Sequence, residues 1–241
     1  MYDVIIVGAG ISGLYMAYRL SEKNPNLLLI DKNNYVGGRI LTIKDTHKNK
    51  SIQYEAGAAR IAHIHTNFLD LIEELGFKKD LIEIKNEKVP IVGNLTYKTR
   101  HQLKKVYTTS EKLEIPFLIE KILTKAKYFT QTSLRNMSMY NLAQHVLSFL
   151  AADFLLDAFG YESELLHLNA YDGVRMFKKD FNSNNKFFIL KSGLSKVCES
   201  IYQILEKRGV TIKLGVQFQD YVYSVKKKMF TVKIQDLRKI N

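Results

Sequence analysis

The sequence contains only one cysteine among 241 residues, which excludes an internal disulfide and suits a reducing compartment. We expect this residue, Cys198, to be a small buried side chain on a helix. No run of eighteen apolar residues occurs, so no membrane span is expected. The first residues already have the pattern of a core strand and lack a basic-then-apolar leader. These features predict an intracellular, cytoplasmic protein without a secretory signal.

Acidic residues are few, since 24 Asp and Glu stand against 36 Lys and Arg, which gives a net charge of +12. Such a balance favours anionic partners. The basic residues are nevertheless spread along the chain, and no nucleic-acid-binding motif is recognisable. Lys226, Lys227 and Lys228 fit the tip of a hairpin, and the lysines within residues 121–127 fit a solvated helix face. We therefore predict no specific nucleic-acid partner.

The N-terminal residues predict a strand, a glycine turn, a helix and a second strand. Residues 2–7 are apolar and β-branched, the turn is Gly8-Ala9-Gly10-Ile11-Ser12-Gly13, and a helical pattern starts there. The second strand, residues 27–30, ends at Asp31. The first glycine permits the turn, the second admits a pyrophosphate, and the third lets helix and strand pack closely. The helix N-terminus favours phosphates and Asp31 can accept ribose hydroxyls, which predicts a Rossmann-like dinucleotide-binding domain.

Two further segments decide which dinucleotide is expected. Gly37-Gly38-Arg39 follows the acidic residue closely, and Ala56-Gly57-Ala58-Ala59-Arg60-Ile61 comes next. Together with the glycine turn, these segments resemble the FAD-dependent amine oxidase superfamily, and the second resembles its L-amino-acid oxidase branch most. The resemblance implies FAD as the cofactor and is specific over residues 2–75. A glutamate is commoner in that family where this chain has Asp31.

The resemblance also implies a set of site residues. Arg60 is expected to lie over the flavin and pair with a substrate carboxylate; the alternative is that it supports the flavin or an acid such as Glu55. A glycine-opened helix at Ser192-Gly193 and the strand after it resemble the family's return to the FAD domain, with Phe218 where a backbone contact to adenine is expected. The implied cofactor-binding residues are Gly8, Gly10, Ile11, Ser12, Gly13, Asp31, Lys32, Gly38, Arg39, Gly57, Ala58, Ala59, Arg60 and Phe218.

The expected fold class is α/β, with a Rossmann-like FAD-binding domain of the GR2 type and an inserted mixed α+β substrate region. We predict residues 1–80 as the first segment of the FAD-binding domain, 81–185 as the insertion and 186–241 as the second segment. The insertion is expected to contain short strands at 89–92 and 95–97. A helix capped by Ser110 is expected to end before Pro116 or bend there, and a second helix is expected from about 117 to 126. Its longest predicted helix covers residues 141–159.

Other polar residues carry weaker expectations. His63 and His65 are two residues apart, but no cysteine or carboxylate cluster joins them, so no metal site is predicted. His145 is expected to be a core histidine with a hydrogen-bonded partner, and residues 171–175 are expected to form a turn.

The predicted function is an FAD-dependent oxidoreductase of the amine oxidase type, acting on the C–N bond of a small amine or amino acid with oxygen as acceptor. Members of this superfamily continue with a C-terminal FAD segment that covers the flavin. Three alternatives therefore stay open: a fragment that lacks the C-terminal half, one part of a complex that a second polypeptide completes, or a non-catalytic FAD-binding or structural protein. An NAD(P)-dependent reductase is disfavoured by Gly37-Gly38-Arg39.

Overall fold

The computed structural model describes residues 1–239 except 49, 85–90, 93–94, 97–99 and 181–185. The chain forms two compact units. Unit 1 comprises Met1–Ile84 together with Phe187–Asn241, and unit 2 comprises Lys85–Lys186. The predicted domain boundaries fall within a few residues of these limits, while the roles assigned to the domains stay predictions.

A three-stranded parallel sheet forms the centre of unit 1. Its strands are β1 (Val4–Val7), β2 (Leu27–Asp31) and β10 (Thr211–Leu214), in the order β1-β2-β10. Every residue of the central strand β2 is buried, as expected for a parallel strand covered on both faces. The register pairs Val7 with Ile30 and Leu214 with Asp31, so the carboxyl ends of all three strands meet at one edge.

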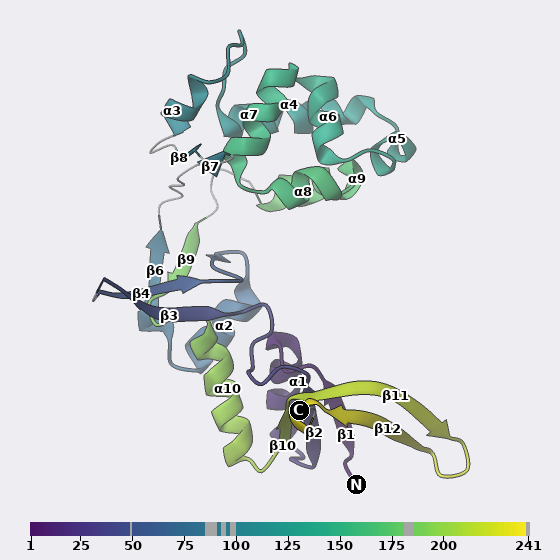
Figure 1. Ribbon diagram of the computed structural model, residues 1–241. Helices are drawn as coiled ribbons and strands as arrows, with labels where there is room; N and C mark the ends of the chain where they lie inside the picture. The colour runs from purple at the N-terminus through teal and green to yellow at the C-terminus, as the bar shows by residue number, and fades with distance from the viewer. Residues whose placement is uncertain (49, 85–90, 93–94, 97–99, 181–185, 240–241) are drawn as a thin grey trace. The chain divides into compact units, whose positions relative to one another are not determined.

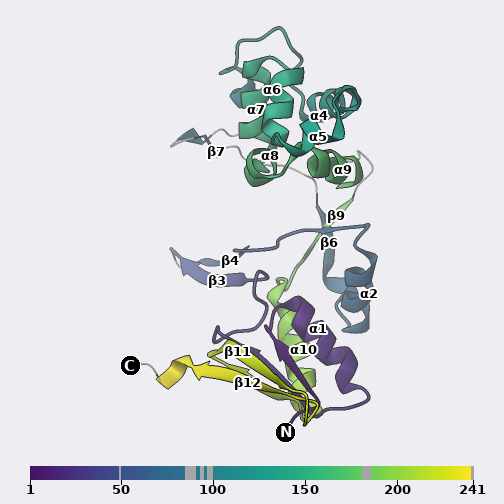
Figure 2. The same cartoon turned by 90° about the vertical axis from the view of Figure 1, so that its right-hand side faces the viewer.

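Alternation along β2 explains how both faces are covered. Leu27 and Leu29 face a core that contains helix α1 (Ile11–Ser21) and helix α10 (Ser195–Lys207). These two helices lie side by side in both views of the chain (Figures 1 and 2). Leu28 and Ile30 face the opposite way and pack against Val216 at the start of a long hairpin. This hairpin consists of β11 (Val216–Ser224) and β12 (Met229–Asp236), and the predicted lysine tip lies between its strands.

The remaining elements of unit 1 precede and follow the insertion. A hairpin joins β3 (Thr42–His47) to β4 (Lys50–Glu55), and helix α2 spans Thr66–Glu74. Strand β9 (Phe187–Leu190) lies between β5 (Ile61–Ala62) and β6 (Leu81–Ile84) in a second, antiparallel sheet. Residues on either side of the insertion therefore meet within one small sheet of unit 1.

Unit 2 is mainly helical. Its core contains the fully buried Phe154, Phe177, Leu118, Ile122 and Met139. The elements are β7 (Ile91–Val92), β8 (Leu95–Thr96), α3 (Arg100–Lys104), α4 (Ile115–Lys125), α5 (Gln131–Arg135), α6 (Met139–Val146), α7 (Phe149–Phe159), α8 (Glu162–His167) and α9 (Ala170–Asp180). The expected strand at 89–92 lies partly outside the described residues, as does the end of the one at 95–97. No helix of the described residues is long and apolar enough to cross a membrane.

Two helix predictions in unit 2 are wrong in their boundaries. Pro116 begins helix α4 instead of ending a helix at 110–116, because a proline in the first turn has no hydrogen bond to lose. The helix predicted over 141–159 is two helices, α6 and α7. Ser148 separates them because its hydroxyl accepts a hydrogen bond from the backbone amide of Ala151, which starts a new helix.

Two further expectations are also corrected. Residues 171–175 form part of helix α9 and not a turn. Gly173 belongs there for packing, because a Cβ at this position would lie 2.2 Å from the side chain of Met139. His145 is exposed at the end of α6, where its ring lies 6.0 Å from that of Phe129, so it is not a core histidine.

Candidate functional site: a glycine-lined edge of the parallel sheet

The predicted cofactor-binding residues of the glycine turn lie at the carboxyl edge of the parallel sheet. The backbone amide of Gly8 donates to the carbonyl of Ile30 at 2.7 Å, which joins the end of β1 to the end of β2. Gly8 has a φ of +106°, a conformation that side chains rarely adopt. Helix α1 then begins after Gly10, whose carbonyl accepts the first helical bond from Leu14 at 2.9 Å. No side chain caps this N-terminus, so the amides of Ile11, Ser12 and Gly13 lie where an anion would be stabilised.

The three glycines of the turn serve different purposes. A Cβ on Gly13 would lie 1.9 Å from the carbonyl oxygen of Gly8, so this glycine is required by the packing of the helix on the strand. A Cβ on Gly10 would meet only the carbonyl oxygen of Gly37, at 3.9 Å, and the Gly10 backbone is extended with φ −70°. The protein itself therefore does not require glycine at position 10. A cofactor phosphate against the turn would require it, and this is the role that the sequence predicts.

The second glycine pair lies directly against the first turn. The amide of Gly37 donates to the carbonyl of Ala9 at 2.8 Å, and Gly37 forms an isolated parallel bridge with Gly10. Gly37 and Gly38 both have positive φ, +112° and +60°. A Cβ on Gly38 would lie 3.3 Å from the Cα of Gly10. The structure thus brings together Gly10, Gly37, Gly38 and, next in the chain, the exposed Arg39.

Asp31 is fixed by backbone amides on both of its carboxylate oxygens. The amide of Ala9 donates to Oδ2 at 2.7 Å, and the amide of Asn33 donates to Oδ1 at 2.8 Å. The residue is 9% exposed, whereas the neighbouring Lys32 is exposed. A carboxylate oxygen can accept more than one hydrogen bond, so Asp31 retains capacity for ribose hydroxyls. It also ties the glycine turn to the end of β2, a structural role that the sequence analysis did not include.

The third predicted segment is joined to the second by backbone hydrogen bonds. The amide of Ala58 donates to the carbonyl of Arg39 at 2.9 Å, and that of Ala56 donates to Leu41 at 2.8 Å. A Cβ on Gly57 would lie 2.0 Å from the Arg39 carbonyl oxygen, so only glycine permits this close approach. The three glycine-containing segments therefore form one continuous structure at the sheet edge, with Ala59 directly before Arg60.

Arg60 lies just beyond this continuous structure. It is half-buried, and its guanidinium lies 5.6 Å from the centre of the Phe187 ring. The neighbouring acid Glu55 accepts hydrogen bonds from the Thr42 hydroxyl at 2.8 Å and from the Leu194 amide at 2.9 Å. Glu55 therefore attaches the β3–β4 hairpin to the start of α10, a contact between distant residues that no sequence motif indicates.

Phe218 lies on the other face of the sheet from helix α1. Its side chain is partly buried against Leu28 and Ile30. The strand that carries it starts close to the site, because the amide of Gly215 donates to the carbonyl of Asn33 at 2.8 Å. An adenine contact by the Phe218 backbone stays a prediction.

Cys198 supports the site without being reactive. It is fully buried on α10, as predicted, and burial raises the pKa of its thiol to about 12. Its sulfur would lie 3.6 Å from a Cβ built on Gly37, so the cysteine packs beneath the second glycine pair. Its thiolate is therefore suppressed at neutral pH.

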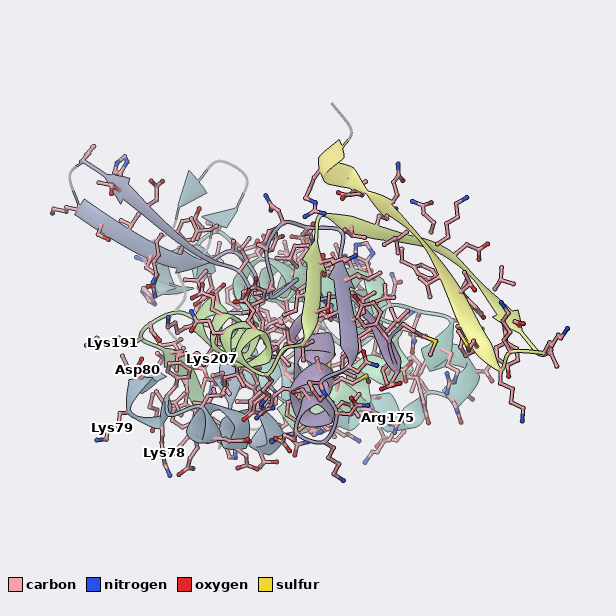
Figure 3. The ribbon with its side chains drawn as sticks, turned by 90° about the horizontal axis from the view of Figure 1, so that it is seen from below. Lys78, Lys79, Asp80, Arg175, Lys191 and Lys207 are labelled. Atoms are coloured by element: carbon pink, nitrogen blue, oxygen red, sulfur yellow. The ribbon has the colours of Figure 1, made fainter. Side chains whose placement is uncertain are left out.

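Among the described residues of unit 1, the remaining polar candidates form no second site. The backbone amide of Ala62 donates to His65 Nδ1 at 3.3 Å, directly before helix α2. No group of three or more His, Cys, Asp or Glu residues suited to a metal occurs among the described residues. Lys78, Lys79 and Lys191 gather around Asp80 (Figure 3), where the Lys191 amide donates to the Asp80 carbonyl. Lys78 is paired with Glu73, so this cluster fits a solvated surface.

Comparisons with known proteins agree with this architecture. The NAD(P)-binding Rossmann-like domain family matches residues 6–75, which include the glycine turn, Asp31 and the two later glycine segments. Flavin-containing amine oxidase A of Equus caballus is 32% identical over 100 residues, which cover 42% of this chain and 18% of that protein. The 4,4'-diaponeurosporene oxygenase of Staphylococcus haemolyticus is 22% identical over 243 residues, covering 88% of this chain and 48% of that protein.

A solved structure of wild-type putrescine oxidase bound to putrescine matches with a TM-score of 0.64 and 21% identity. The match covers 97% of this chain and 54% of putrescine oxidase. The chain thus spans about half the length of that oxidase, and its matches cover less than half of the two sequence relatives.

The fold and the glycine-lined edge define a Rossmann-type dinucleotide-binding protein. The similarity to flavin-containing amine oxidases agrees with the expected superfamily, and the Rossmann-like match and the solved structure confirm the expected α/β fold class. Neither the equine enzyme nor putrescine oxidase is an amino-acid oxidase by name, and the L-amino-acid oxidase branch stays a prediction.

Proposed function

We propose that unit 1 binds FAD and that the chain is the FAD-binding part of an amine oxidase-type oxidoreductase. The observation that carries this proposal is the space at Gly10, where the protein leaves room for a Cβ that a bound pyrophosphate would exclude. The amides at the start of α1 would hold the phosphates, and Asp31 would accept ribose hydroxyls. The flavin-containing amine oxidases among the relatives support FAD over a nicotinamide nucleotide.

The same residues disfavour NADP. The Asp31 carboxylate is held in place by two backbone amides, so it cannot move away from a ribose phosphate. A 2′-phosphate beside it would bring two negative charges together at a buried carboxylate.

The proposed chemistry is oxidation of the C–N bond of an amine or amino acid. FAD, when bound, supplies the hydride acceptor and passes the electrons to oxygen. The role proposed for Arg60 is to orient an amino-acid substrate, because its planar guanidinium can meet both oxygens of a carboxylate. The glycine residues of the three segments would hold the cofactor against this residue through their backbone groups.

Cofactor analysis of the purified protein tests the FAD proposal. We expect flavin absorbance bands and, after extraction and chromatography, FAD. If the protein is purified without cofactor, titration with FAD should saturate, and NAD and NADP should not compete. Recovery of a nicotinamide nucleotide alone, or no saturable binding of FAD, would contradict the proposal.

A second candidate is a flavin-binding protein without turnover of its own, which a further stretch of polypeptide completes. The observation that favours it is the open side of unit 1. Strand β1 is an edge strand of the described sheet, and Val7 at its end is 56% exposed. Met16 and Leu20, one turn apart on α1, are 54% and 40% exposed. An edge strand beside exposed apolar side chains is suited to pair with another strand.

Peroxide release distinguishes the two candidates. We expect the 241-residue chain to show weak or no oxidase turnover with amines or amino acids, even when FAD is bound. A robust peroxide yield from this chain alone would exclude the second candidate and support the enzyme.

A further inference from the structure

Unit 2 contains an open pocket that the proposed function does not use. It has a volume of about 310 Å³ and lies between the short 3₁₀ turn that follows α4, the helix α5 and the helix α9. Its base is apolar, because Ala126, Leu134 and Val174 line it and are 3%, 7% and 8% exposed. A pocket with such a base can remove an apolar group from water.

The rim of this pocket is basic. Lys127, Arg175 (labelled in Figure 3) and Lys178 line it, and all three are exposed. Tyr171 also lines it, and the guanidinium of Arg135 lies 4.3 Å from the centre of the Tyr171 ring. That of Arg175 lies 5.7 Å from the same ring. Three cationic side chains thus line a pocket with a small apolar base, and a fourth, Arg135, lies against the Tyr171 ring.

These cations have no ion-pair partner among the described residues. In the part of the chain that the structure describes, no carboxylate pairs with Arg135, Arg175, Lys127 or Lys178. The acid that follows Tyr171 is Asp172, and it accepts a hydrogen bond from the Asn169 side chain at 2.8 Å. Like charges in one place repel one another, and a bound anion relieves that repulsion.

We propose that this pocket binds a small amphipathic anion, a phosphate or carboxylate that carries an apolar group. The arginine forks suit either anion, because each can donate two parallel hydrogen bonds. The apolar base and the Tyr171 ring accept the apolar group. The volume is near the lower limit for ligand pockets, which restricts the ligand to about the size of one substituted ring. The basic rim excludes a cationic amine, so the pocket is not the entry of an amine substrate.

Binding of phenyl phosphate to the full chain tests this proposal. Calorimetry should show saturable binding, with inorganic phosphate weaker because it lacks the apolar group, and benzyl alcohol without measurable binding because it lacks the charge. Arg175→Gln should weaken phenyl phosphate binding by roughly 10- to 100-fold, the loss of one charge-assisted bond to an anion. Lys125→Gln is the matched control, because Lys125 is an exposed cation at the end of α4 that does not line the pocket.

A third variant distinguishes binding at this pocket from binding at the glycine turn, which also favours phosphates. Gly10→Val should leave phenyl phosphate binding unchanged if unit 2 holds the ligand. Equal losses in Arg175→Gln and Lys125→Gln would indicate general charge attraction and overturn the proposal. The absence of saturable binding, or its loss in Gly10→Val, would overturn it as well.

Discussion

Replacing Gly10 with valine should abolish FAD binding while the protein stays folded. The backbone at this position has φ −70° and ψ 174°, which any residue adopts, and the nearest protein atom to a new Cβ is 3.9 Å away. The expected cost in stability is only that of an unfavoured residue at a helix N-cap, about 1 kcal/mol. For a chain of this length, that corresponds to a decrease of roughly 2–4 °C in Tm.

The expected effect on the cofactor is much larger. A side chain at position 10 would occupy the space through which the pyrophosphate approaches the amides of α1. A charge-assisted hydrogen bond contributes about 1.5–3 kcal/mol, so loss of two would remove about 3–6 kcal/mol of binding free energy. We therefore expect FAD affinity to fall by roughly 10²- to 10⁴-fold.

Flavin fluorescence titration together with thermal unfolding measures both effects in the same samples. Gly76→Ala is the matched control, because Gly76 has φ +82° and lies at the end of α2, away from the glycine turn. This variant should lose about 1 kcal/mol of stability and retain its FAD affinity. Gly13→Ala should instead disrupt unit 1, because its Cβ would lie 1.9 Å from the Gly8 carbonyl oxygen. Wild-type FAD affinity in a folded Gly10→Val protein would refute the reasoning.

Three other predictions concern single side chains. In a catalytically complete form, Arg60→Lys should remove about 2–4 kcal/mol of transition-state binding energy for an amino acid, roughly a 30- to 1000-fold loss of kcat/KM. The decarboxylated amine should lose little activity. Equal losses for both substrates with flavin bound would contradict the carboxylate role. Hydrogen bonds from Arg19 and Tyr18 lower the pKa of Glu74, so its stabilising contribution is present at neutral pH and is lost as acid protonates it. Because this pair is more than a third exposed, Glu74→Gln should cost at most about 1 kcal/mol in urea unfolding at pH 7, and a cost that does not shrink in acid would contradict the ionic origin. Ser148→Ala should destabilise unit 2 by about 1 kcal/mol in the same assay, and no change would show that its cap is not needed.

The sequence predicted unit 1 well because its information is local. The glycine turn, the fully apolar β2 and the acid at its end stand within 31 residues, and each constrains the backbone at its own position. The hairpin of β3 and β4 has little signal in the sequence. Its strands are largely exposed, so no alternation of apolar and polar residues marks them.

Unit 2 was less predictable because several of its boundaries depend on tertiary contacts. Residues 141–159 are apolar on most sides, and periodicity alone does not show that Ser148 caps a second helix. Pro116 is compatible with either the end or the start of a helix, and the buried Ile115 and Leu118 decide for the start. Glycine is common in turns, yet Gly173 lies in helix α9. Met139 packs in the space that a side chain at position 173 would occupy.

The glycine motif combines two kinds of constraint that its sequence cannot separate. Gly13 is required by the Gly8 carbonyl oxygen, and therefore by the fold, whereas Gly10 has space around it within the protein. A protein that kept this fold but bound no dinucleotide would be free to replace Gly10 and would still need Gly13. Asp31 combines the two constraints in one side chain, since the amides that fix it already use an acceptor site on each oxygen. Substitution of Asp31 therefore tests the fold and the cofactor together, and Gly10 is the position at which cofactor binding can be tested alone.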